Sequence, residues 1–221
     1  MASESVFAKT RVLIVDDHPV VREGLGSIIN QEPDLEVVGA TDSVTVAREL
    51  VVGHEPEAVV VDLGLGAEDG LEFVHELATE NPELAIVVFS LHDELLFAER
   101  ALVAGARAYV MKTERPETLL QAIRTAVSGG YTVSDRVSTR MLSASVAAPA
   151  ARPRELGRLS DRELAIFRLI GSGLTTREIA SRVNLSVKTV ESHRLHIKKK
   201  LGLASANELV VQAASWVLRE H

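Results

Sequence analysis

The sequence predicts an α/β protein: a doubly wound parallel sheet of the (βα)5 type, followed by a small all-α unit of four helices. Two observations predict this architecture. Five short apolar runs alternate with helical patterns through residues 1–130, and residues 158–221 hold several closely spaced helix starts and no strand pattern. Alternating strands and helices are typical of a parallel sheet with helices on both faces.

The five apolar runs are nearly continuous rather than alternating, as expected for strands that helices cover on both faces. We expect strands at Val12–Val15, Leu35–Ala40, Ala58–Val61, Ala85–Phe89 and Ala108–Met111. The helical patterns between and after them lie at Val20–Asn30, Val44–Val52, Leu71–Thr79, Leu95–Ala104 and Glu117–Val127.

A boundary follows the last of these helices. Gly129 and Gly130 end its pattern, and residues 144–157, ASVAAPAARPRELG, are rich in Ala and Pro without strand or helix periodicity. Proline disfavours a continuous helix, so this stretch is typical of a linker. We predict a first domain at 1–130, a linker at 131–157 with a short helix near Arg136–Ser143, and a second domain at 158–221.

The sign of the net charge changes at the boundary between the linker and the second domain. Residues 1–157 hold 13 basic and 25 acidic side chains, a net charge of −12, whereas residues 158–221 hold 11 and 6, a net charge of +5. A small basic domain suits a polyanionic partner, although charge alone would also allow chance segregation.

Other features exclude classes of protein. The chain has no cysteine, which excludes disulfides and thiolate metal sites. No run of 18 apolar residues is present, and the N-terminus lacks the apolar core of a signal peptide. We therefore predict a cytoplasmic protein with no membrane partner.

Polar residues follow four of the five strands where each strand ends. Asp16 and Asp17 follow the first strand, Asp62 the third, Ser90 the fourth and Lys112 the fifth. The carboxyl ends of parallel strands share one edge of a sheet, so these side chains should converge there. Three carboxylates, a hydroxyl and an ammonium suit an oxygen-coordinated cation beside a phosphoryl group.

This convergence predicts particular chemistry. A carboxylate pair repels itself unless a cation joins it, and Mg²⁺ favours one or two carboxylates, a carbonyl and phosphate oxygens. Asp62 would then accept a phosphoryl group, Ser90 would hydrogen-bond it, and Lys112 would neutralise its charge. Any one of these aspartates alone would be interpreted as a solvated loop residue.

The first domain resembles the receiver domain of two-component response regulators. The resemblance lies in VLIVDDH (Val12–His18), VVVDLGLGAEDG (Val59–Gly70), VVFSLHD (Val87–Asp93) and AGARAYVMK (Ala104–Lys112). It implies that Mg²⁺ binds Asp17, Asp62 and the backbone carbonyl of Gly64. Asp16 would bind the ion through a water molecule. It also implies that Tyr109 rotates in response to phosphorylation, coupled to the hydroxyl of Ser90.

Three residues near the expected site are less regular. Gly66 stands where the family often has proline, which predicts a flexible loop after Asp62. His18 and His92 flank the site, and we interpret them as residues that orient loops or face solvent rather than as catalytic bases.

The second domain shows repeated helix-start signals. Capping boxes of the form S/T-x-x-E occur at Ser160, Thr175 and Ser205, and Ser186 is a further N-cap. The intervening turns are short enough for a helix-turn-helix.

The helix Ser186–Leu201 would present a polar face to DNA. With Val190, Ile197 and Leu201 in the core, the opposite face carries Lys188, Thr189, Glu191, Ser192 and Leu195. Phosphate contacts would come from Arg194, Lys198 and Lys199, and from Thr176 and Arg177 of the preceding helix. The basic residues alone would equally fit a solvated helix face.

Residues Leu159–Leu203 resemble a LuxR-type helix-turn-helix, so the whole chain resembles the NarL/FixJ response regulators. One departure is Glu191, where the family commonly has a basic residue. Its carboxylate would either accept from cytosine or repel phosphate, so the DNA sequence recognised does not transfer.

The resemblances imply a transcriptional regulator, not an enzyme, that a sensor histidine kinase phosphorylates on Asp62 and that binds double-stranded DNA as a homodimer. One alternative stays open. The receiver would be only a dimerisation module in a phosphorylation-independent regulator. An aspartyl-phosphate phosphatase is disfavoured because Gly64 stands where that class of enzyme has a second aspartate.

Overall fold

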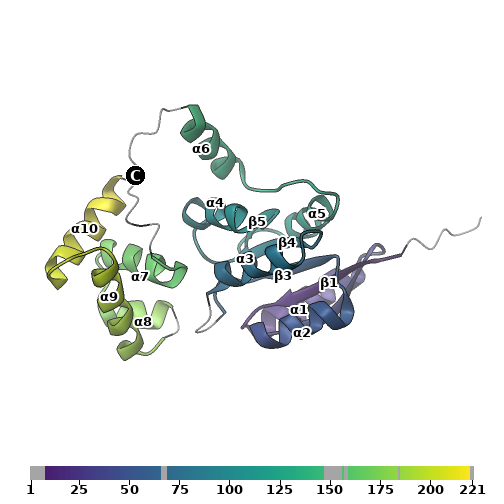
Figure 1. The fold of residues 1–221 in the computed structure, drawn as a ribbon, viewed down its shortest axis with the longest axis horizontal. Helices are drawn as coiled ribbons and strands as arrows, with labels where there is room; N and C mark the ends of the chain where they lie inside the picture. The colour runs from purple at the N-terminus through teal and green to yellow at the C-terminus, as the bar shows by residue number, and fades with distance from the viewer. Residues whose placement is uncertain (1–7, 66–68, 147–155, 157–158, 184, 220–221) are drawn as a thin grey trace, which may run out of the picture. The chain divides into compact units, whose positions relative to one another are not determined.

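The computed structural model describes residues 8–65, 69–146, 156, 159–183 and 185–219. They form two compact units, Met1–Ala147 and Ala148–His221. The first runs from purple to green in Figure 1, and the second continues to yellow at the C-terminal end.

The first unit is built on a five-stranded sheet in which every neighbouring pair of strands is parallel. The strand order is β2-β1-β3-β4-β5, as in a doubly wound fold. The fold class predicted from the apolar runs is therefore confirmed. The strands are β1 Thr10–Val15, β2 Leu35–Thr41, β3 Ala58–Val61, β4 Ala85–Ser90 and β5 Ala108–Met111.

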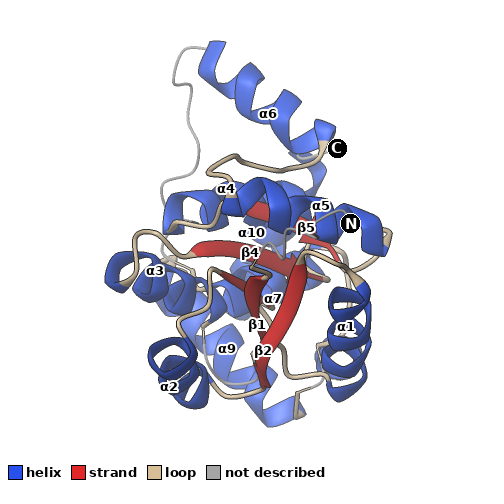
Figure 2. Ribbon diagram, turned by 90° about the vertical axis from the view of Figure 1, so that its right-hand side faces the viewer, coloured by secondary structure: helices blue, strands red, loops and turns tan. Residues whose placement is uncertain are grey.

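Helices cover both faces of this sheet (Figure 2). On one face, Ile29 of α1 and Ile123 of α5 are buried in one cluster with residues of β1, β3, β4 and β5. The helices are α1 Pro19–Gln31, α2 Val44–His54, α3 Gly70–Glu80, α4 Glu94–Ala104 and α5 Pro116–Val127.

Local signals set where these helices begin. Proline opens α1 and α5, where the first backbone N–H needs no partner within the helix. Asp69 and Asp93 cap α3 and α4 by accepting backbone N–H groups of the first turn. The helices that follow β3 and β4 therefore begin at fixed points close to the carboxyl edge of the sheet.

A sixth helix, α6 Asp135–Val146, lies in the segment that the sequence analysis assigns to the linker. It packs against α4, and Arg136 of α6 lies 3.6 Å from the carboxylate of Glu94. This contact groups α6 with the first unit.

The second unit consists of four helices: α7 Asp161–Gly171, α8 Thr176–Arg182, α9 Val187–Lys200 and α10 Ala206–Arg219. Complete capping boxes open α7 and α8, and the Ser186 hydroxyl accepts the Thr189 N–H at the start of α9. The box expected at Ser205 differs, because the Glu208 carboxylate accepts from the N–H of Ala204, one residue earlier.

The core of the second unit lies between α7, α8, α9 and α10. Val190 and Ile197 of α9 are fully buried as predicted, whereas Leu201, just past the end of the helix, is only half-buried. Trp216 of α10 packs against Phe167 of α7 with ring centroids 5.8 Å apart. Trp216 is therefore a core residue of this unit.

An ion pair between a buried carboxylate and an exposed lysine connects α7 to α9. The Glu163 side chain is 4 % exposed, and one of its carboxylate oxygens accepts hydrogen bonds from the Ser160 N–H and the Lys200 ammonium, both at 2.7 Å. Burial raises the pKa of Glu163, but the bonds from Lys200 and Ser160 outweigh it and hold the pKa below its ordinary 4.5. The folded unit therefore favours the ionised form of Glu163.

The lowered pKa sets the pH range in which Glu163 stabilises the fold. Its contribution is full above pH 4.5 and is lost as pH falls through the lower folded value. We expect Glu163→Gln to cost about 1–3 kcal/mol at neutral pH and to make the unit's stability less sensitive to acid. Urea unfolding followed by fluorescence of Trp216, the single tryptophan, measures both effects.

The matched control is Glu191→Gln, which removes an exposed carboxylate of α9. Equal acid sensitivity of wild type and Glu163→Gln would contradict this account of the ion pair.

Candidate functional site

Three of the predicted side chains meet at the carboxyl edge of the sheet. The ammonium of Lys112, whose side chain is 6 % exposed, lies 2.6 Å from Asp16 Oδ2 and 2.7 Å from Asp62 Oδ2. Hydrogen bonds between backbone groups extend the pairing of the strands to these residues. The Asp62 N–H donates to the Val15 carbonyl, and the Lys112 N–H donates to the Ser90 carbonyl. The register of the strands therefore brings these side chains together.

Burial dominates the electrostatics of this cluster. Asp16 and Asp62 are 2 % and 4 % exposed. Desolvation raises the pKa of Asp16, although hydrogen bonds from Lys112 and from the His18 backbone oppose it. With Asp17 included, three carboxylates face one ammonium, which leaves an excess of negative charge.

Oxygen atoms in the cluster lack hydrogen-bond partners. Asp62 Oδ1 and Asp17 Oδ1 are buried, and neither accepts a hydrogen bond from a described residue. Asp17 Oδ1 instead lies 2.5 Å from the imidazole Nδ1 of His18. Ligand atoms of Asp16, Asp17, His18 and Asp62 all lie within 4.8 Å of one another. The buried, unpaired Asp62 oxygen and the close spacing of the three carboxylates fit a hard divalent cation.

Gly64 lies directly beside the Asp62 carboxylate. A Cβ at this position would stand 3.3 Å from Asp62 Oδ2 and 3.6 Å from the imidazole Cε1 of His92. The absence of a side chain keeps the space between the Asp62 carboxylate and the His92 imidazole free. Gly66, for which a flexible loop is expected, lies outside the described residues.

Ser90 and Tyr109 are linked through His92. The fully buried Ser90 Oγ lies 2.8 Å from His92 Nδ1 and accepts the His92 backbone N–H at 3.2 Å. The Tyr109 hydroxyl donates to the His92 carbonyl at 2.9 Å, and Tyr109 is 3 % exposed. The two predicted switch residues therefore contact the same loop residue.

The two histidines are the site residues whose roles the sequence analysis did not foresee. His18 belongs to the cluster of potential cation ligands, and His92 bonds both switch residues. Their position next to Asp17 and two residues after Ser90 was visible in the sequence. Which atoms they contact depends on loop conformation, which the sequence pattern did not specify.

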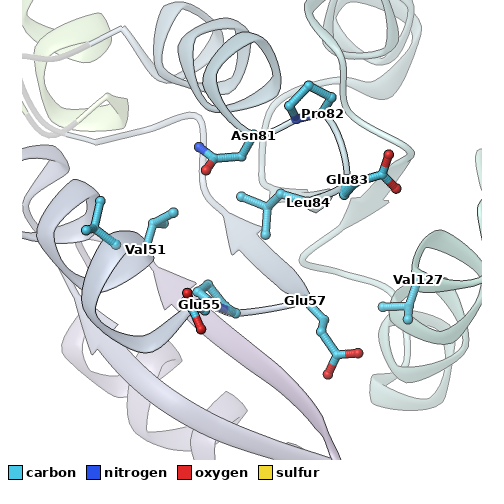
Figure 3. Close-up of a pocket in the computed structure, with 10 residues that line it drawn as sticks. Val51, Glu55, Glu57, Asn81, Pro82, Glu83, Leu84 and Val127 are labelled. Carbon is cyan, nitrogen blue, oxygen red and sulfur yellow. The ribbon is translucent and has the colours of Figure 1, made fainter.

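A separate hollow of about 650 Å³ lies at the opposite edge of the sheet (Figure 3). Glu57 and Leu84, which line it, precede β3 and β4, so it opens at the amino ends of these strands. It contains none of the predicted site residues.

The second unit exposes the face of α9 that the sequence analysis assigns to DNA. Lys188, Glu191, Ser192 and Lys199 are exposed, and Leu195 is 59 % exposed although it is apolar. The other members of the predicted set are Thr189, Arg194 and Lys198, which are half-buried, and Thr176 and Arg177 of α8, half-buried and exposed.

The run Lys198–Lys200 is divided between two roles. Lys200 is held by Glu163, and Lys198 donates to the Ala204 carbonyl at 3.4 Å. Within the described part of the chain, the Lys199 ammonium forms no hydrogen bond or ion pair, and its side chain is exposed. Lys199 is therefore the member of this run whose ammonium is best placed for an external anion.

Two family models together match most of the chain. Residues 12–124 match the response regulator receiver domain, and residues 157–213 match the bacterial regulatory proteins of the luxR family. Among the described residues, no helix is both long enough and apolar enough to cross a membrane.

Individual proteins show the same combination. The chain is 36 % identical over 217 residues to the oxygen regulatory protein NreC of Staphylococcus aureus. This match covers 95 % of this chain and 99 % of that protein. A solved LuxR-family two-component response regulator from Aurantimonas sp. SI85-9A1 is 31 % identical, with a TM-score of 0.58 over 63 % of this chain and 100 % of that chain.

A DNA-bound structure also resembles this chain along nearly its whole length. RcsB from Salmonella enterica serovar Typhimurium, bound to promoter rprA in the presence of phosphomimetic BeF3⁻, is 25 % identical with a TM-score of 0.53. The match covers 94 % of this chain and 99 % of that chain. The chain belongs to the NarL/FixJ-type two-component response regulators, DNA-binding transcription factors rather than enzymes, which join a receiver domain to a LuxR-type helix-turn-helix domain.

Proposed function

We propose that Asp62 is the phosphoacceptor of this response regulator and that its phosphorylation controls DNA binding by α9. The observation that carries the proposal is the position of Asp62 Oδ1. This oxygen is buried and has no hydrogen-bond partner among the described residues, while Lys112 holds the other oxygen of the same carboxylate. One oxygen is thus available to a phosphorus atom, and a cation stands beside the other.

The phosphoryl donor in this proposal is a phosphohistidine of a sensor histidine kinase. A carboxylate oxygen of Asp62 forms the new P–O bond as the P–N bond breaks, and the departing imidazole takes up a proton. Lys112 neutralises charge on the phosphoryl oxygens, and the Ser90 hydroxyl donates a hydrogen bond to one of them. NarL/FixJ regulators act with histidine kinases, which supports this donor.

Mg²⁺ is the cation that fits the donor set. Asp17 and Asp62 would bind it directly, Asp16 through water, and the Gly64 backbone carbonyl would complete the protein ligands. When bound, Mg²⁺ supplies positive charge that offsets repulsion between the carboxylates and the incoming phosphoryl group. His18 contacts Asp17 and Asp16 at the rim of this cluster.

Phosphorylation adds a charge of about −1.5 to −2 at the carboxyl edge of the sheet. Ser90 and Tyr109 would respond as switch residues because both contact His92 in the loop between β4 and α4. The added charge therefore acts on α4 and β5 by shifting an equilibrium between two conformations of this loop.

The DNA-binding surface in this proposal is the exposed face of α9. Lys188, Thr189, Glu191, Ser192 and Leu195 would face base edges in the major groove. Five further residues would contact phosphates: Arg194, Lys198, Lys199, Thr176 and Arg177.

We propose that the receiver domain spans residues 1–130, the linker 131–157 and the DNA-binding domain 158–221.

We also propose that the protein binds DNA as a homodimer. Val210 and Val211 of α10 are 41 % and 64 % exposed, which supports a second copy as the occupant of this helix face. Binding to chromosomal DNA implies that the protein acts in the cytoplasm. The complete set of receiver residues disfavours the phosphorylation-independent alternative.

Phosphoryl transfer to Asp62 is tested directly with a small-molecule phosphodonor and Mg²⁺. We expect one acid-stable, hydroxylamine-sensitive acyl phosphate per chain, located on the peptide that contains Asp62 by mass spectrometry. Asp62→Asn removes the nucleophilic oxygen and should abolish the modification. Asp42→Asn, which removes a carboxylate that is 62 % exposed, is the control. Modification of Asp62→Asn at the wild-type level would contradict the proposal.

The burial of the Asp16 carboxylate leads to a second prediction, which concerns thermal stability. Because burial raises its pKa, the favourable contribution of Asp16 is complete below pH 3.8 and is lost as pH rises through the folded value. At neutral pH with a chelator, Asp16→Asn should therefore raise the melting temperature by a few degrees. It should also gain less stability from Mg²⁺ than wild type, as measured by circular dichroism. A lower melting temperature in chelator would oppose this assignment.

The phosphate contacts make a third prediction. Removing one ammonium from the interface should lower the slope of log affinity against log salt concentration by about one. We expect this change for Lys199→Gln and none for Lys9→Gln, which alters the receiver unit. Fluorescence anisotropy with a selected duplex measures the slope. An unchanged slope for Lys199→Gln would remove this residue from the interface.

A further inference from the structure

The imidazole of His92 lies within hydrogen-bonding distance of the hydroxyl that the proposed phosphorylation needs. Ser90 Oγ lies 2.8 Å from His92 Nδ1 and accepts the His92 backbone N–H at 3.2 Å. A serine hydroxyl carries one proton. In the tautomer of His92 that carries its proton on Nε2, Nδ1 accepts the serine proton, which then cannot also be donated to a phosphoryl oxygen on Asp62. The imidazole and the phosphoryl group therefore compete for Ser90.

His92 is also held in place by its neighbours. Its ring contacts the edge of Phe97 in α4, with centroids 5.0 Å apart, and its carbonyl accepts the hydroxyl of Tyr109. Gly64 leaves the ring next to the Asp62 carboxylate, because no side chain stands between them. The imidazole therefore lies against Ser90 on one side and against Phe97 of α4 on the other, while the His92 carbonyl bonds Tyr109 of β5.

We propose that His92 is a positioning residue that sets the threshold of the switch by restraining the Ser90 hydroxyl. The proposal rests on the proposed phosphorylation of Asp62 and extends it to a residue outside the acceptor, cation and phosphoryl ligands. Phosphorylation must break the hydrogen bond between Ser90 and the imidazole. The free energy of the switch to the active conformation is therefore less favourable by the contribution of that bond. Because Tyr109 bonds the same residue, release of Ser90 also changes the surroundings of Tyr109.

Two nearly isosteric substitutions separate the hydrogen bond from simple packing. Asparagine at position 92 can place a polar atom close to the position of Nδ1, whereas leucine fills similar space without a hydrogen-bonding group. The variants are therefore His92→Asn and His92→Leu. His75→Leu is the control, since His75 is an exposed residue of α3.

The response is measured by titrating beryllofluoride, a phosphoryl analogue, in Mg²⁺ while recording ¹⁹F NMR spectra of protein labelled with 3-fluorotyrosine. The chain has two tyrosines, so Tyr109 gives one of two signals, and Tyr131→Phe assigns it. Tyr131 is 70 % exposed, which separates its environment from that of the buried Tyr109.

We expect His92→Leu to lower the half-maximal beryllofluoride concentration about fivefold, the factor that corresponds to one net hydrogen bond. His92→Asn and His75→Leu should stay within about twofold of wild type. In a Ser90→Ala background, His92→Leu and His92→Asn should respond alike, because the hydroxyl for which His92 competes is gone. Thermal unfolding of each variant verifies that it is folded.

Equal midpoints for His92→Leu and His92→Asn in the presence of Ser90 would overturn the proposal while leaving phosphorylation of Asp62 intact. A wild-type Tyr109 signal that does not respond to beryllofluoride would instead overturn the switch itself, and the role of His92 with it. Loss of phosphoryl transfer to Asp62 would be seen separately in the mass spectrum.

Discussion

The contact of one buried ammonium with two buried carboxylates is the constraint on which the receiver unit depends. The Lys112 ammonium lies within 2.7 Å of a carboxylate oxygen of both Asp16 and Asp62. Each of these two aspartates exposes only a few per cent of its surface. One ammonium cannot balance three carboxylates once Asp17 is counted, so the cluster favours an added cation. The parallel sheet makes the cluster unavoidable, because adjacent strands deliver these residues to the same edge.

The second unit carries the opposite charge and uses it differently. The net charge of +5 of residues 158–221 is not spread evenly over one surface, since Lys200 neutralises the buried Glu163 while Lys199 stays exposed on α9. The fold of the DNA-binding domain thus uses one lysine of the run and leaves others for phosphate. Charge counted from sequence alone overestimates the part that is available to DNA.

The sheet and the acceptor cluster were predictable because they follow from patterns with a fixed period. Continuous apolar runs gave the strands, and the residues after Val15, Val61 and Phe89 then had to share one edge. Long-range or loop-dependent contacts were not predictable. The pairing of Lys200 with Glu163 joins residues 37 positions apart. The contact of His92 with Ser90 depends on the conformation of a side chain in a loop, for which the sequence provides no periodic signal.

The central claim is that charge added at Asp62 changes the affinity of α9 for DNA, and paired binding measurements test it most directly. Wild type and Asp62→Ala are titrated against the same selected duplexes, with and without a phosphodonor and Mg²⁺. The account predicts that the donor raises the affinity of wild type and leaves Asp62→Ala unchanged. Equal affinities for both proteins, unaffected by the donor, would contradict it and would indicate a regulator that works without phosphorylation.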